Sequence, residues 1–131
     1  MRFRTMTTAL ATMLLATSAL AQLAPVTTAQ LRDRLQTGKA LVIDVRESNE
    51  LADGVIAGAR LLPMSQLPQR TAEIPNDPDQ PVYLVCRTQN RSQKVAQQLA
   101  QLGYKNVTYV QGGMSAWQAG GLPVVQPPKS P

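Results

Sequence analysis

Short apolar runs alternate with segments of helical periodicity along the chain. The run at 82–85 (VYLV) is too short for a helix and rich in residues that favour β structure, so it predicts a buried strand. The nearly unbroken apolar run at 40–45 (ALVIDV) is typical of a strand covered on both faces. Shorter strands are expected at 59–62 and 106–110. Strands separated by helices in this way indicate βα units, an α/β fold and a mainly parallel sheet.

Two longer helices are predicted from apolar residues at helical spacing. The first follows a cap at Thr27 or Thr28 and stops at Gly38. The second has Ser92 as its N-cap and continues to Gly103. Its apolar positions are Val95, Ala96, Leu99 and Leu102.

Shorter helical segments and a connector complete the pattern. Residues 48–54 predict a capped helical turn, 65–73 a short helix that Pro68 interrupts, and the residues around Trp117 a single turn. The breaker-rich segment 75–81 is a surface connector. No internal repeat is evident, and the length suits one domain.

The first 21 residues have the features of a cleaved secretory signal peptide. Arg2 and Arg4 form a basic start, residues 8–16 an apolar core, and residues 19–21 a small-x-small cleavage site. Threonines break the apolar core, which is shorter than the roughly 20 residues a membrane span needs, so cleavage is preferred to an uncleaved anchor. The mature protein, 22–131, is therefore expected in a bacterial periplasm and free of the membrane.

Composition narrows the range of partners. The net charge of +5 falls to +3 once Arg2 and Arg4 are removed. The basic residues are scattered along the chain, and the chain has few aromatic residues. These features argue against a nucleic-acid partner and favour a small anionic substrate. The Pro-rich end at 126–131 is expected to be disordered.

The chain contains no histidine and one cysteine. A Cys-His protease and a Ser-His-Asp hydrolase are excluded, and a metal site is not expected from one cysteine without histidine. A single cysteine also rules out an internal disulfide. No cofactor is predicted.

Cys86 lies where the 82–85 strand ends and a helix begins. The start of a helix carries unpaired N–H groups, and a short loop around one sulfur adds inward N–H groups that form an anion-binding nest. Arg87 and Arg91 add two cations. These groups favour a reactive thiolate. An inert core thiol is the alternative.

Asp44 and Arg46 follow a strand at the sheet edge where α/β proteins bind ligands. One interpretation is that the two side chains simply pair. In the other, Asp44 braces the Cys86 loop and Arg46 is a surface ion-pair partner.

Three segments together resemble the signature segments of a single-domain rhodanese: VIDVRESNELADGVIAGA, VYLVCRTQNRS and VTYVQGGMSAWQAGGLPV. The resemblance implies a three-layer fold with a five-stranded, mainly parallel sheet flanked by helices. It also implies a sulfurtransferase that moves a sulfane sulfur from a donor such as thiosulfate to cyanide or a thiol through a Cys86 persulfide. The loop and substrate-binding residues would be Arg87, Thr88, Gln89, Asn90, Arg91 and Ser92.

The sequence departs from the family pattern at two positions. Val55 stands where members often carry a histidine, which is usually structural. Gln89 stands where many related loops have glycine. If that position needs a positive φ, glutamine would be strained or would reshape the mouth of the site.

Other functions stay open at this point. The active-site loops of cysteine phosphatases and arsenate reductases have the pattern C-x5-R. In this chain four residues separate Cys86 from Arg91, which favours a tighter cradle for one sulfur. A non-catalytic binding module with the rhodanese fold is a second alternative. A third is a sulfur carrier that passes its sulfur to a periplasmic protein thiol.

Overall fold

The computed structural model describes residues 23–129, so the predicted signal peptide at 1–21 lies outside the described residues. Within this range, no helix is long and apolar enough to cross a membrane. Residues 126–129 are in neither helix nor strand, and Pro127 and Pro128 line a cavity beside Ser48.

The core of the fold is a four-stranded parallel sheet in the order β2-β1-β3-β4. The predicted strands are confirmed, and three of them are slightly shorter than expected. Their bounds are β1 Leu41–Asp44, β2 Arg60–Leu61, β3 Val82–Val85 and β4 Val107–Tyr109. In the register of the two central strands Asp44 faces Val85, so both chains leave the sheet at the same edge.

The fifth strand implied by the family resemblance is reduced to a single parallel bridge between Val26 and Val110. The Val26 N–H donates to the Tyr109 carbonyl at 3.2 Å, and the Gln111 N–H donates to the Val26 carbonyl at 2.8 Å. Pro25 has no N–H to extend the ladder, and Thr27 already caps a helix. The pairing is therefore limited to one residue.

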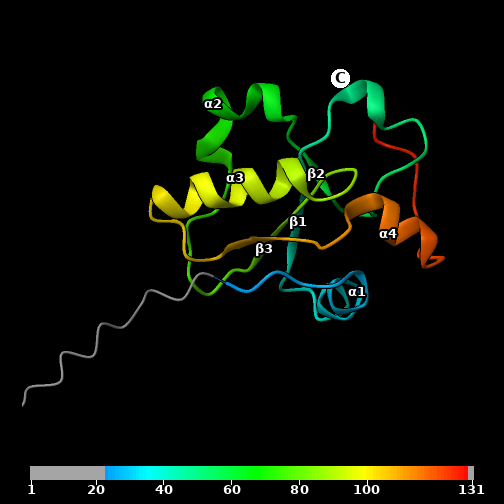
Figure 1. The fold of residues 1–131 in the computed structure, drawn as a ribbon, viewed down its shortest axis with the longest axis horizontal. Helices are drawn as coiled ribbons and strands as arrows, with labels where there is room; N and C mark the ends of the chain where they lie inside the picture. Colours follow the sequence, from blue (N-terminus) through cyan, green and yellow to red (C-terminus); the bar gives the residue numbers. More distant parts are fainter. Residues whose placement is uncertain (1–22, 130–131) are drawn as a thin grey trace, which may run out of the picture.

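Helices cover both faces of the sheet (Figure 1). On one face lie α3 (Asn90–Gln101) and α2 (Leu67–Arg70), the latter flanked by the 3-10 turns η2 (Met64–Gln66) and η3 (Thr71–Glu73). On the other face lie α1 (Thr28–Gln36) and α4 (Gly113–Ala119). The three-layer α/β fold is confirmed.

The side chains of β3 alternate between the two cores. Val82, Leu84 and the following Cys86 pack with the α2 and α3 side, whereas Tyr83 and Val85 pack with the α1 and α4 side. All four residues of β3 are buried, as its continuous apolar sequence requires. The strand that leads to Cys86 is thus held rigidly between two layers.

The structure also tests three expectations about the segments between the longer elements. Thr27, rather than Thr28, caps α1 through a capping box with Gln30. The predicted turn at 48–54 contains the 3-10 turn η1 (Ser48–Glu50). Val55 is buried and exchanges two backbone hydrogen bonds of 2.8 Å with Val125, which ties the C-terminal segment to the domain.

Candidate active site

Cys86 directly follows β3 and precedes the loop into α3, as predicted. Its side chain is only 1% exposed and packs in the core that includes Val95 and Ala96. The thiol is therefore enclosed in this conformation, and a reagent can reach it only if its surroundings move.

The N-cap prediction for Ser92 is wrong, because α3 begins three residues earlier, with Gln89 at the N-cap position. Ser92 is the third residue of the helix, and its N–H donates to the Cys86 Sγ at 3.4 Å. The Gln89 side chain makes no cap hydrogen bond, so the Cys86 sulfur takes the acceptor role that an N-cap oxygen normally has. The start of α3 and the Cys86 thiol thus form one structural unit.

The Ser92 hydroxyl completes a short chain of hydrogen bonds at the thiol. The Cys86 S–H donates to Ser92 Oγ at 3.3 Å, and the Ser92 O–H donates to the Gln89 carbonyl at 3.2 Å. Ser92 is fully buried. In the part of the chain that the structure describes, Ser92 supplies the one backbone N–H that donates to Sγ, so the expected nest of several inward N–H groups is not formed around the sulfur.

The carbonyl groups of the loop are directed toward the first turn of α4. The Met114 N–H donates to the Cys86 carbonyl and the Ser115 N–H to the Arg87 carbonyl, each at 2.9 Å. The close approach depends on Gly113, where an added Cβ would lie 2.1 Å from the Thr88 carbonyl oxygen and 2.4 Å from that of Cys86. Gly113 also has a φ of +55°, which favours glycine.

Gln89 is not strained, because its φ is −153°. Its side chain reaches across to the start of α4, where Oε1 accepts a hydrogen bond of 3.1 Å from the Gly112 N–H. The position therefore has no need of glycine in this chain. Instead, the glutamine side chain adds a contact between the loop and α4.

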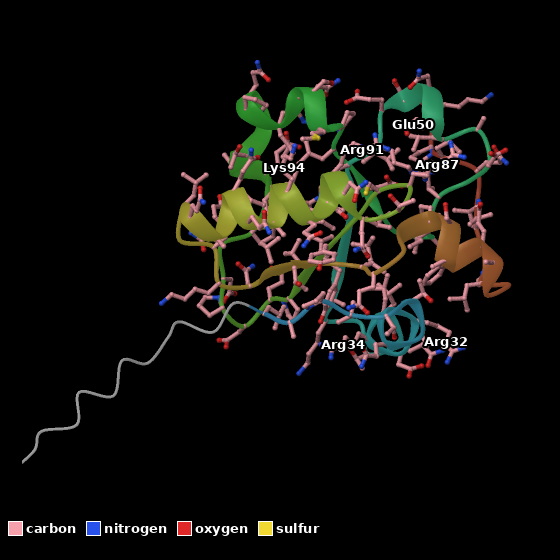
Figure 2. The ribbon with its side chains drawn as sticks, in the orientation of Figure 1. Arg32, Arg34, Glu50, Arg87, Arg91 and Lys94 are labelled. Carbon is pink, nitrogen blue, oxygen red and sulfur yellow. The ribbon has the colours of Figure 1, made fainter. Side chains whose placement is uncertain are left out.

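Arg91 is paired with Glu50, a site residue that the sequence analysis missed. Two hydrogen bonds of 2.7 Å join the guanidinium to the carboxylate, and Figure 2 shows both side chains near the first turn of α3 together with Arg87. The Arg91 hydrogen bond lowers the pKa of Glu50 to about 2, and Glu50 in turn raises the pKa of Arg91. Glu50 is one of two acidic residues in the predicted 48–54 turn, but nothing local to it indicates a partner 41 positions away in the sequence.

Asp44 and Arg46 pair with each other at the end of β1. This is the first of the two interpretations of these residues, in which the side chains simply pair. Arg46 Nη2 lies 2.7 Å from Asp44 Oδ2, and the two side chains are 5% and 0% exposed. Arg46 is thus buried rather than at the surface, and Asp44 makes no hydrogen bond to the Cys86 loop. The remaining donors of Arg46 bind the carbonyls of Glu50 and Gly54, at 3.2 and 3.0 Å. The pair therefore supports the segment that carries Glu50.

Arg87 is exposed, and its guanidinium forms no ion pair with any residue in 23–129. It borders a cavity of about 300 Å³ between η1 and α4. The other lining residues are Arg46, Asn49, Glu50, Ala52, Asp53, Met114, Ser115 and Gln118. Thr88 and Asn90 are exposed, and their side chains make no hydrogen bond within the described range. Arg87 is thus the loop cation available to an anionic ligand.

The described residues hold no cluster of three or more histidine, cysteine, aspartate or glutamate side chains that could bind a metal ion. The chemistry that these residues themselves support is nucleophilic. A thiol at a helix start and next to a hydroxyl can become an anionic sulfur that attacks an electrophile.

Comparison with known proteins gives consistent matches. The profile of the Rhodanese-like domain matches residues 27–120. A sulfurtransferase of Allochromatium vinosum is 42% identical over 91 residues, which cover 70% of this chain and 83% of that protein. The putative sulfurtransferase YtwF of Bacillus subtilis is 35% identical over 94 residues, covering 71% and 88% of the two chains. The crystal structure of a rhodanese-related protein from Thermoplasma volcanium superposes with a TM-score of 0.72 at 31% identity, and it covers 80% of this chain and all of that one.

Proposed function

The chain belongs to the rhodanese-like domain family, and on that basis we propose that it is a sulfurtransferase that carries a sulfane sulfur as a persulfide on Cys86. The observation that carries the proposal is the position of the Cys86 thiol at the start of α3, where both the N–H and the hydroxyl of Ser92 contact Sγ. A helix start favours negative charge, so an anionic sulfur is stabilised there. The sulfurtransferase names of two relatives support the same reaction class.

The first step loads the cysteine. With thiosulfate as donor, the Cys86 thiolate attacks the outer sulfur of thiosulfate, the sulfur–sulfur bond of the donor breaks, and sulfite leaves with the electron pair. The product is a Cys86 persulfide that keeps one negative charge. Arg87 is placed to hold the oxygens of the anionic donor, because Arg87 borders the cavity and forms no ion pair with another described residue.

The second step unloads the cysteine. A thiophilic acceptor, either cyanide or a thiolate, attacks the outer sulfur of the persulfide, and the sulfur–sulfur bond to Cys86 breaks. The Cys86 thiolate is regenerated, and thiocyanate or a new persulfide leaves. Ser92 assists both steps when its O–H turns from the Gln89 carbonyl to the anionic Sγ, which lies 3.3 Å from Oγ.

The test is the intact mass of the purified mature protein after incubation with thiosulfate. The protein gains one sulfur atom, and the Cys86→Ser variant gains none. If neither thiosulfate nor a persulfide donor loads the wild-type protein, the enzymatic proposal is rejected.

A second candidate function is a non-catalytic binding module, and the 1% exposure of Cys86 favours it. An enclosed thiol that packs in the core can serve structure alone. The same mass measurement separates the two candidates, because a binding module retains an unmodified thiol. Slow alkylation of native Cys86, with a rate set by global unfolding, supports the binding module.

The proposal extends to location and partner. The sequence of residues 1–21 supports export to a periplasm, where the acceptor is a small thiophile or a protein thiol. Expression of the full chain in a Gram-negative host tests the export. A mature N-terminus at Gln22 in the periplasmic fraction agrees with it, and an uncleaved cytoplasmic protein contradicts it.

A further inference from the structure

Three hydrogen bonds join the Cys86 loop to the start of α4. Two of them use backbone carbonyls, those of Cys86 and Arg87, and form with any side chains in the loop. The third is the 3.1 Å bond from the Gly112 N–H to the Gln89 side chain. Of these three bonds, the one made by Gln89 is therefore the bond that depends on which amino acid the loop carries.

These contacts join a wall of the cavity to the loop that carries the thiol. Arg87 of the loop and Met114 of α4 border the cavity of about 300 Å³, whereas Cys86 does not. The Met114 N–H is bound to the Cys86 carbonyl, so the junction between loop and α4 links a wall of the cavity to the residue that carries the sulfur.

We propose that Gln89 is a specificity-determining residue that holds this junction closed through Gly112. Bulky sulfur donors then reach Cys86 from the cavity only when the junction opens, whereas small donors pass after a smaller movement of the residues around the thiol. The proposal rests on the proposed sulfurtransferase function. Gln89 is half-buried and acts through the loop rather than on the donor. Opening the junction breaks the Gln89–Gly112 hydrogen bond, and one neutral hydrogen bond changes an opening equilibrium by between about twofold and about tenfold.

The experiment compares alkylation of native Cys86 by a small reagent, iodoacetamide, and by a bulky one, a polyethylene-glycol maleimide. Gln89→Met keeps the length of the side chain but removes the acceptor. We expect the bulky reagent to react about fivefold faster with this variant, as the loss of one neutral hydrogen bond allows, and iodoacetamide to change by less than about twofold. Gln97→Met, an exposed position on α3, is the matched control with wild-type rates.

Two further variants make the result decisive. Gln89→Glu keeps an acceptor for the Gly112 N–H and should retain the wild-type ratio of the two rates. Gln89→Asn is too short to reach Gly112 and should behave like Gln89→Met, which also covers the case in which Gln89→Met does not fold. An unchanged rate ratio in Gln89→Met and Gln89→Asn, or an equal acceleration of both reagents, overturns the proposal.

The two proposals fail separately, because alkylation requires no sulfur donor. A changed rate ratio without sulfur loading from any donor retains the role of Gln89 in access and rejects the sulfurtransferase. Sulfur loading with an unchanged rate ratio does the opposite. When both hold, the preference of kcat/KM for thiosulfate over a bulky persulfide donor falls about fivefold in Gln89→Met, which follows from the alkylation result.

Discussion

Glu50 holds Arg91 through two hydrogen bonds of 2.7 Å, although the two residues lie 41 positions apart in the sequence. The Glu50 carbonyl also accepts a hydrogen bond from Arg46, whose side chain is buried against Asp44. The end of β1 is thereby connected to the first turn of α3, which follows the Cys86 loop. Arg91 is thus held by an acidic partner, whereas Arg87 forms no ion pair with any residue in 23–129.

Substitution Glu50→Gln should destabilise the domain. The variant loses the ionic part of a bidentate pair whose side chains are 29% and 33% exposed, so the free energy of unfolding should fall by about 1 kcal/mol after allowance for solvent screening. Urea denaturation measures the change. Glu73→Gln, which breaks the more exposed pair with Arg70, is the control and should have a smaller effect. Equal effects of the two substitutions would show that Glu50 and Arg91 form only a surface contact.

Acid should remove the contribution of Glu50 to stability. The hydrogen bond from Arg91 holds the pKa of Glu50 at about 2, below the ordinary value of 4.5 that applies to the unfolded chain. Because the folded-state pKa is depressed, the contribution is fully present above pH 4.5 and is lost as the pH falls toward about 2. The difference in unfolding free energy between wild type and Glu50→Gln should therefore shrink over this window. A constant difference would contradict the assignment.

Substitution Gly113→Ala should displace the loop from α4. The new Cβ would lie 2.1 Å from the Thr88 carbonyl oxygen and at a positive φ, so we expect a loss of about 2–4 kcal/mol in unfolding free energy. Gly121→Ala is the matched control, because Gly121 also has a positive φ, +70°, but has no neighbour within 4 Å. Chemical denaturation should show a clearly larger loss at Gly113. Equal losses would mean that backbone conformation alone decides.

Substitution Arg87→Gln should weaken donor binding and leave stability almost unchanged. The guanidinium has no ion-pair partner within residues 23–129, so unfolding should shift by less than about 0.5 kcal/mol. Loss of a charge-assisted contact to an anionic donor should raise the KM for thiosulfate about tenfold with a smaller change in kcat. Steady-state kinetics test this, and Arg87→Lys should recover part of the loss. An unchanged KM would place the donor elsewhere.

Local patterns determined the elements of this fold and the place of its cysteine. The apolar run 82–85 is strand β3, and the helical spacing of Val95 and Leu99 belongs to α3. The strand is recognisable because burial on both faces requires continuous apolar side chains, and the helix because one face must repeat with the helical period. The position of Cys86 between strand β3 and helix α3 follows from those two patterns alone.

Tertiary structure decided how the groups around the thiol are used. Gln89 contacts Gly112, 23 residues later, and this contact exists because the loop after β3 and the start of α4 meet at one edge of the sheet. Serine is a common N-cap residue, but the helix starts before Ser92, and the sulfur of Cys86 accepts the hydrogen bond that an N-cap side chain normally accepts. The enclosure of the thiol and the partner of Arg91 depend on which distant segments the parallel sheet brings together. Periodicity in the sequence carries no information about those pairings.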